Sequence, residues 1–463
     1  MERGKQNRMS MLRTFLLSPF GFFVQFVAAA LILVFHLEYQ GAFVFLGIFC
    51  AVLCVSDNIC ASTLPFLLAC VFLAKCGNSY DVFMPYWWVI IFPFGALLYH
   101  LVKFRKPIQR GKAFWGIFAA SVAVTIGGLG TITAKEYFAG GALFHVAALG
   151  FGMLLAYVIL YTYIEAPKGQ NMITFFSNMM FTLGLFAAFM VAHHYLVFLP
   201  AVLEKREILA FQWRNNVSSI LMLCLPFPFF LALKNPWKLL AGLAIFAAML
   251  LTGSRGALLF GTIEFVMCII YLLWADKKRR IAYAIIVVIA IGVLALLFRD
   301  LILLIKPTII RLITLLFSTE TEARVALYAR AIEDFKNHPI FGVGLGYMGN
   351  RDVHPSKDFA LCWYHNAPLQ VLASLGLVGV AAYLLQMIAR VRIFLKTRSA
   401  FHGALFIAFL GIEMMSLVNP GVFAPLPYLL LVTIFLVIAE KTQVEKSAPQ
   451  AAVPLAKELE NQT

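Results

Sequence analysis

The feature that most constrains the fold of this chain is a series of long apolar segments with few or no charged residues. An uncharged run of about twenty apolar residues has the length of a helix that crosses the hydrocarbon core of a bilayer. Several segments are short or contain proline, so 12 to 14 true spans fit the pattern. The segments are approximately 15–36, 42–55, 61–75, 86–104, 114–133, 142–163, 173–193, 217–233, 238–252, 256–274, 281–303, 366–389, 401–418 and 424–440. The sequence therefore predicts an all-α polytopic membrane protein.

Composition agrees with this class and argues against others. Of 463 residues, 62% are hydrophobic and only 13% are charged. The net charge of +15 could suit a nucleic-acid partner, but in membrane proteins lysine and arginine collect in cytoplasmic loops. We therefore expect no nucleic acid among the partners. The eight cysteines form no CxxC pair and show no zinc-binding spacing.

The distribution of lysine and arginine predicts the orientation. With the N-terminus inside, 23 of the 37 basic residues fall in cytoplasmic segments, and eight of the others lie in one long outer loop. FRKPIQRGK, DKKRR and ARVRIFLKTR fall on the same, cytoplasmic side. Both termini are then cytoplasmic. The predicted parts are an N-terminal tail (1–14), a transmembrane helix bundle (15–298), a large external loop (299–364), C-terminal transmembrane helices (365–440) and a disordered cytoplasmic tail (441–463).

The external loop contains a predicted amphipathic helix. Leu327, Ala331 and Phe335 recur at helical spacing. His338 and the proline after it end this helix, and the glycine-rich segment 342–346 is expected to be a flexible turn. The sequence GVGLG there neither follows a strand nor opens a clear helix, so its context argues against a dinucleotide site.

Three polar stretches precede helices that should all start on the outer side. The stretches are QWRNN (212–216), TGSRG (252–256) and YHN (364–366), before helices expected to begin near Val217, Ala257 and Ala367. A helix N-terminus presents free backbone N–H groups and the positive end of the helix dipole. This combination suits an anion, above all a phosphate or diphosphate.

The side chains at these helix starts strengthen that interpretation. Arg214 and Arg255 add positive charge, and Ser254 and Asn366 are plausible helix caps. His365 has the intrinsic pKa of a general base, about 6.5. The convergence of cations, helix N-termini and one imidazole on a single membrane face favours a site.

Each of these residues also has an ordinary structural explanation. An arginine at a membrane boundary often extends toward lipid headgroups, and Arg324 could be a solvated charge with Tyr328 one helical turn away. His365 alone could be an interfacial residue. Glu264 and Glu413 lie inside apolar segments, where we expect hydrogen bonds between helices.

Four ordered motifs resemble one known family. SRGALL (254–259), R-x3-Y-x2-A (324–331), HPIFGVGLG (338–346) and HNAPLQVLASLGLVG (365–379) are similar to the bacterial O-antigen ligase and polymerase family of polytopic glycosyltransferases. Ser374 stands where many relatives carry an acidic residue, so a role that depends on that carboxylate is in doubt here.

The resemblance implies a GT-C-like fold in the bacterial cytoplasmic membrane, with an active site facing outside. It implies metal-independent transfer of a glycan from undecaprenyl diphosphate to a glycolipid or glycan acceptor, such as lipid A-core. The other expected partners are membrane lipids, and no cofactor is expected. The outer loops offer no compact D-x-D or histidine cluster for a metal. The candidate catalytic residues are His365 and Arg255. The candidates for binding diphosphate or glycan are Arg214, Arg324, Ser254, Asn366 and Tyr328.

Other functions stay open. A polymerase that extends lipid-linked repeat units would use the same donor chemistry. A flippase or transporter for lipid-linked oligosaccharides should show internal repeats and a polar site at the membrane midplane, and neither is evident in the sequence. A scaffolding membrane protein would tolerate loss of His365 and Arg324.

Overall fold

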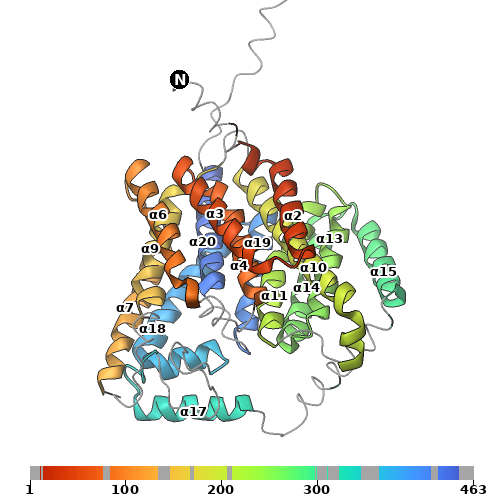
Figure 1. The fold of residues 1–463 in the computed structure, drawn as a ribbon. Helices are drawn as coiled ribbons and strands as arrows, with labels where there is room; N and C mark the ends of the chain where they lie inside the picture. The colour runs from red at the N-terminus through yellow and green to blue at the C-terminus, as the bar shows by residue number, and fades with distance from the viewer. Residues whose placement is uncertain are drawn as a thin grey trace, which may run out of the picture.

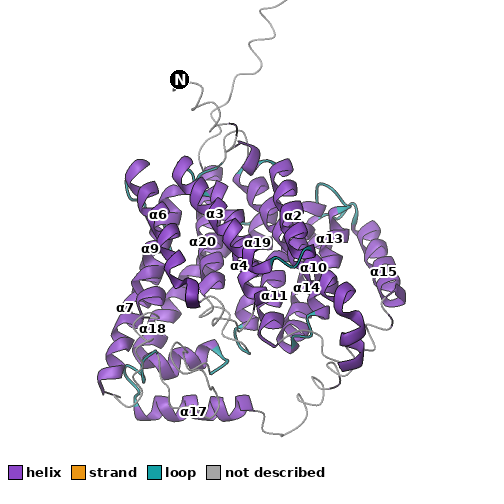
Figure 2. Ribbon diagram, in the orientation of Figure 1, coloured by secondary structure: helices purple, strands orange, loops and turns teal. Residues whose placement is uncertain are grey.

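The computed structural model describes residues 14–76, 84–133, 146–166, 171–205, 211–297, 323–345, 364–418 and 426–447, together with the single residues Met11, Arg299 and Ile310. Every regular element in these ranges is helical, as Figure 2 shows. In chain order the helices are α2 (Pro19–Val34), α3 (Glu38–Val55), α4 (Cys60–Cys76), η1 (Met84–Ile90), α6 (Ile91–Lys103), α7 (Phe114–Thr133), η3 (Ala148–Gly152), α9 (Met153–Tyr163), α10 (Met172–Lys205), α11 (Phe211–Cys224), α12 (Pro226–Ala232), α13 (Lys238–Leu251), η4 (Ala257–Gly261), α14 (Thr262–Ala275), α15 (Arg280–Leu297), α17 (Ala323–Asn337), α18 (Ala367–Lys396), α19 (Ala400–Met415) and α20 (Leu426–Ser447).

The prediction of an all-α polytopic membrane protein is confirmed. Six helical stretches in the described ranges are long and apolar enough to cross a membrane. They are Glu38–Val55, Pro85–Lys103, Met172–Phe198, Arg214–Ala232, Ala257–Ala275 and Ala367–Lys396. Shorter apolar helices, among them α2, α13 and α19, stand between them in the bundle (Figure 1). The count of 12 to 14 spans stays a prediction.

Aromatic side chains pack the centre of the bundle. The ring of Phe176 on α10 lies 5.5 Å from that of Phe227 on α12 and 5.3 Å from that of Phe435 on α20, nearly perpendicular to both. Edge-to-face geometry is favoured between aromatic rings because the positive edge of one meets the negative face of the other. Small residues let helices approach closely, and a Cβ at Gly184 would lie 2.7 Å from the Cβ of Cys224.

Segments predicted to be cytoplasmic contact one another at one end of the bundle. Asn58 Nδ2 donates to the Glu165 carbonyl oxygen at 2.9 Å, and Lys106 Nζ lies 2.7 Å from Glu165 Oε1. Gln443 Nε2 donates to the Ile393 carbonyl oxygen at 2.6 Å. Helix α17 lies at the other end from the one where the chain enters α2 (Figure 1). Which of these two ends faces the cytoplasm stays a prediction.

The amphipathic helix predicted in the long loop is confirmed as α17, with Leu327 and Ala331 buried on one face. The remainder of the predicted loop, apart from Arg299, Ile310, 323–345 and Tyr364, lies outside the described residues. The same holds for most of both predicted tails, although α20 continues past residue 440 to Ser447. One helix start was wrong: α11 begins at Phe211, before the predicted Val217.

Candidate functional site

Helix α18 is broken near its N-terminal end, and the chain just after α17 fills the break. Gly376 has φ +63° and ψ −159°, a conformation open essentially only to glycine. Backbone hydrogen bonds then join the two segments: Val343 N to the Ala373 carbonyl oxygen at 2.9 Å and Leu377 N to the Pro339 carbonyl oxygen at 2.9 Å. The prediction that 342–346 forms a flexible turn is therefore wrong for 342–345, which are buried.

Ser374 lies inside this break. Its hydroxyl accepts a hydrogen bond from Gln370 Nε2 at 3.0 Å, and its carbonyl oxygen accepts one from Gly344 N at 3.0 Å. The side chain is 2% exposed. Ser374 is thus a neutral, hydrogen-bonded group at the position where the resemblance led us to expect an acidic residue.

Ser254 caps the helical segment that carries Arg255. Its Oγ accepts from Ala257 N at 3.4 Å and donates to Asn215 Oδ1 at 2.9 Å. The turn before it is made by Gly253, whose φ of +66° favours glycine. The cap predicted at Ser254 is present, and it also joins this turn to the first turns of α11, next to Arg214.

Asn366 caps α18 and ties it to the end of α19. Its Oδ1 accepts from Leu369 N at 3.0 Å, and its Nδ2 donates to the Leu417 carbonyl oxygen at 2.9 Å. Ala367 N donates to the Ser416 carbonyl oxygen at 2.8 Å. The predicted cap is present, and α18 starts where the sequence predicts.

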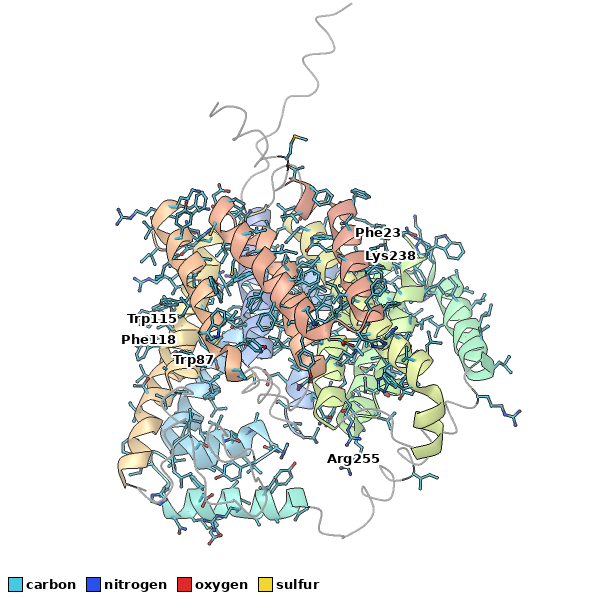
Figure 3. All side chains as sticks on the ribbon, in the orientation of Figure 1. Phe23, Trp87, Trp115, Phe118, Lys238 and Arg255 are labelled. Carbon is cyan, nitrogen blue, oxygen red and sulfur yellow. The ribbon has the colours of Figure 1, made fainter. Side chains whose placement is uncertain are left out.

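The end of α19 brings two of the three predicted stretches together. Gly256 packs so closely against it that a Cβ there would lie 2.7 Å from Met415 Sδ and 2.9 Å from Val418 Cγ2. Arg255 and His365 therefore flank the same few residues, although about a hundred residues separate them in sequence. Figure 3 places Arg255 at the end of the bundle that faces α17. Both side chains are partly exposed.

His365 has a strained backbone. Its φ is +52°, in the left-handed region that non-glycine residues rarely adopt. Such conformations cost about 1–3 kcal/mol and persist where neighbouring contacts enforce them. The contacts around His365 therefore hold its backbone in a conformation that it would not keep in an unconstrained loop.

The other predicted residues are placed less fully. Arg214 is in the first turns of α11 and Tyr328 is on α17, each partly exposed. Arg324 lies in the first turn of α17, but its side chain is outside the described residues. Among the side chains that are described, no three of His, Cys, Asp and Glu are grouped so that they could hold a metal ion.

Sequence patterns did not identify Asp334, which contacts Tyr364, the neighbour of His365 in sequence. Asp334 is fully buried on α17, and its Oδ2 accepts from the Tyr364 hydroxyl at 2.7 Å. Burial raises the pKa of the Asp334 carboxyl, although the Tyr364 hydrogen bond and the nearby charge of Arg330 act in the opposite direction. The available signal was spacing: Asp334 shares the buried face of α17 with Leu327 and Ala331, where a carboxylate is unusual.

The sequence predicts hydrogen bonds between helices for two carboxylates, Glu413 and Glu264, and the structure shows such a bond for one of them. Glu413 on α19 makes the expected contact between helices, because Arg390 Nη1 on α18 donates to its Oε1 at 3.0 Å. For Glu264 on α14 the expectation was wrong. Its side chain is fully buried, and neither of its oxygens has a hydrogen-bond partner among the described residues.

Comparison with known proteins identifies the part of the chain that contains this site. Residues 239–384 match the protein-family model described as O-Antigen ligase. The matched region begins in α13 and ends inside α18, so it includes Ser254, Arg255, α17 and His365, but not Arg214. No curated protein has a significant match to the chain.

Proposed function

Because residues 239–384 form an O-antigen ligase family domain, we propose that this membrane protein is a ligase that transfers a glycan from undecaprenyl diphosphate to an acceptor of the lipid A-core type. In this proposal the reaction takes place at the outer face of the bacterial cytoplasmic membrane, without a metal ion or cofactor. Both termini are then cytoplasmic.

One observation carries the proposal: Arg255 and His365 flank the same end of α19, each beside a capped helix N-terminus. Backbone N–H groups and a guanidinium favour a diphosphate, and a water-poor setting strengthens that attraction. The imidazole beside them can accept a proton.

The proposed step uses these groups as follows. An acceptor sugar hydroxyl attacks the anomeric carbon of the donor glycan, and a new C–O bond forms. The bond from that carbon to the diphosphate breaks, and the diphosphate leaves with the electron pair. His365 takes the hydroxyl proton as general base, and Arg255 stabilises the charge that grows on the leaving group. Arg214, Arg324, Ser254, Asn366 and Tyr328 bind diphosphate or glycan.

Replacing His365 or Arg255 with alanine tests these roles. The purified variants are given the undecaprenyl-diphosphate-linked glycan with lipid A-core, and the release of undecaprenyl diphosphate is measured. We expect each variant to lose at least about a hundredfold in turnover. Arg279→Ala, at the predicted cytoplasmic end, is the matched control and should stay active. Full turnover in either test variant would remove that residue from the mechanism, and loss of turnover on adding a chelator would contradict metal independence.

A deletion strain separates the ligase from the polymerase. Carrier-bound polymer with none attached to the final acceptor indicates a ligase, whereas single repeat units indicate a polymerase. Donor trapped on the inner leaflet would instead indicate a flippase. The sidedness is tested with cysteines at positions 255 and 365 and a reagent that does not cross the membrane. Labelling from opposite sides would contradict the proposed site.

A further inference from the structure

The strained backbone of His365 is enforced by its two neighbours in sequence, which are anchored to different helices. On one side is Tyr364, held by α17. On the other is Asn366, held by the end of α19 through the Leu417 carbonyl oxygen. His365 lies between two fixed points, so its conformation depends on both.

We propose that Asp334 and Tyr364 are positioning residues that hold His365 in its left-handed conformation and so aim its imidazole at the reacting hydroxyl. This inference rests on the proposed function, because it assumes that the imidazole acts in transfer. Neither residue is proposed to touch the substrate.

Tyr364 is anchored by its side chain and by its backbone. It is fully buried, its hydroxyl donates to Asp334 Oδ2 at 2.7 Å, and its backbone N donates to Gln370 Oε1 at 3.1 Å. The ring belongs to a small buried cluster with Val343 and Ala373, apart from the main core. Rotation of the backbone at His365 would move this ring out of the cluster or break its hydrogen bonds.

Asp334 is itself held in place on α17. Its Oδ1 lies 3.1 Å from Nε of Arg330, one helical turn earlier. A carboxylate that accepts from a hydroxyl and faces a guanidinium has little freedom to follow a moving tyrosine. The external helix therefore supplies a rigid support for the residue next to the imidazole.

Positioning of this kind affects turnover more than donor binding. A catalytic group displaced by about 1 Å can cost about a hundredfold in rate, whereas groups that bind the diphosphate are untouched. We therefore expect Tyr364→Phe and Asp334→Ala to lower kcat by about tenfold to a hundredfold, with the KM for the lipid-linked donor unchanged. Asp334→Asn retains an oxygen that accepts from the tyrosine hydroxyl, so it should retain most of the kcat.

A second measurement reports the position of His365 without using activity. The full-length variants are treated with diethylpyrocarbonate, and modification of His365 is followed by mass spectrometry. Release of the anchor should increase the modification rate severalfold in Tyr364→Phe and Asp334→Ala, but not in Asp334→Asn. The matched control is Tyr157→Phe, which removes a similar 2.8 Å bond from a buried tyrosine to Glu440 at the predicted cytoplasmic end.

The outcomes separate this inference from the proposed function. Full activity in His365→Ala would overturn the general-base role and, with it, the catalytic purpose of the anchor. An inactive His365→Ala together with wild-type kcat and modification rates in Tyr364→Phe and Asp334→Ala would overturn the positioning inference alone. Equal losses in Asp334→Asn and Asp334→Ala would also overturn it, because the retained acceptor would then have no effect.

Discussion

Replacing Gly376 with alanine should detach the segment after α17 from α18. The glycine has φ +63°, and a Cβ there would lie 2.4 Å from the Ile340 carbonyl oxygen and 2.7 Å from Gly342 N. These are backbone atoms and cannot rotate away, so the whole segment must move. The transmembrane bundle does not depend on this contact and should stay folded.

The cost can be worked out from two contributions. Forcing alanine into this backbone conformation costs about 1–3 kcal/mol. Displacing the segment also breaks the bonds from Leu377 N to the Pro339 carbonyl oxygen at 2.9 Å and from Val378 N to the Ile340 carbonyl oxygen at 3.2 Å. At about 1 kcal/mol for each bond, docking is weakened by about 3–5 kcal/mol. The docking equilibrium then falls by between about a hundredfold and a few thousandfold.

Hydrogen exchange measured by mass spectrometry is the direct assay. Peptides covering 338–345 and 366–378 should lose protection, and peptides from α10 and α19 should keep it. Gly292→Ala on α15 is the control, because a Cβ there meets nothing within 4 Å and alanine favours a helix by up to about 1 kcal/mol. Unchanged protection of both the 338–345 and the 366–378 peptides in Gly376→Ala would refute the reasoning.

Three further outcomes are expected. Ser254→Ala should lose about 0.5–2 kcal/mol of local stability, measured by exchange across the 252–258 turn, with Ser254→Thr keeping most of it because its hydroxyl can still bond Asn215. Glu264→Met should raise the free energy of unfolding by about 1–3 kcal/mol in detergent, since it removes a buried carboxyl without a described partner, and a decrease would contradict this. Because the pKa of Asp334 is raised when α17 is docked, docked α17 binds more protons than undocked α17. The protection of α17 against hydrogen exchange should therefore be greatest below the ordinary pKa of 3.8. It should fall as the pH rises through the raised pKa. Asp334→Asn should abolish this pH dependence.

The positions of the helices could be predicted well because apolar length is a strong signal. The segment predicted at 238–252 is α13 at 238–251, and the segment predicted at 114–133 has the same bounds as α7. The start of α11 was predicted too late, at Val217 instead of Phe211, because hydropathy shows only where the apolar part of a helix begins. The polar turns around Arg214 continue the helix beyond that point.

The candidate site was predictable only in part. Ser254 and Asn366 were identified as caps because capping depends on local sequence. The bond between Asp334 and Tyr364 joins residues thirty apart in the chain, and no local rule pairs them. The sequence also could not predict that the Glu264 carboxyl lacks a hydrogen bond among the described residues. The groups around this carboxyl become known only once α19 is seen packed against α14.

The dependence of the α18 start on α19 has a consequence for biogenesis. The ribosome synthesises residues 338–366 before residues 416–418, yet Asn366 and Ala367 find their acceptors only at Leu417 and Ser416. The arrangement around His365 can therefore be completed only after α19 has been synthesised and packed against the start of α18. A nascent chain that stops before residue 416 could place most of its helices and still lack this arrangement.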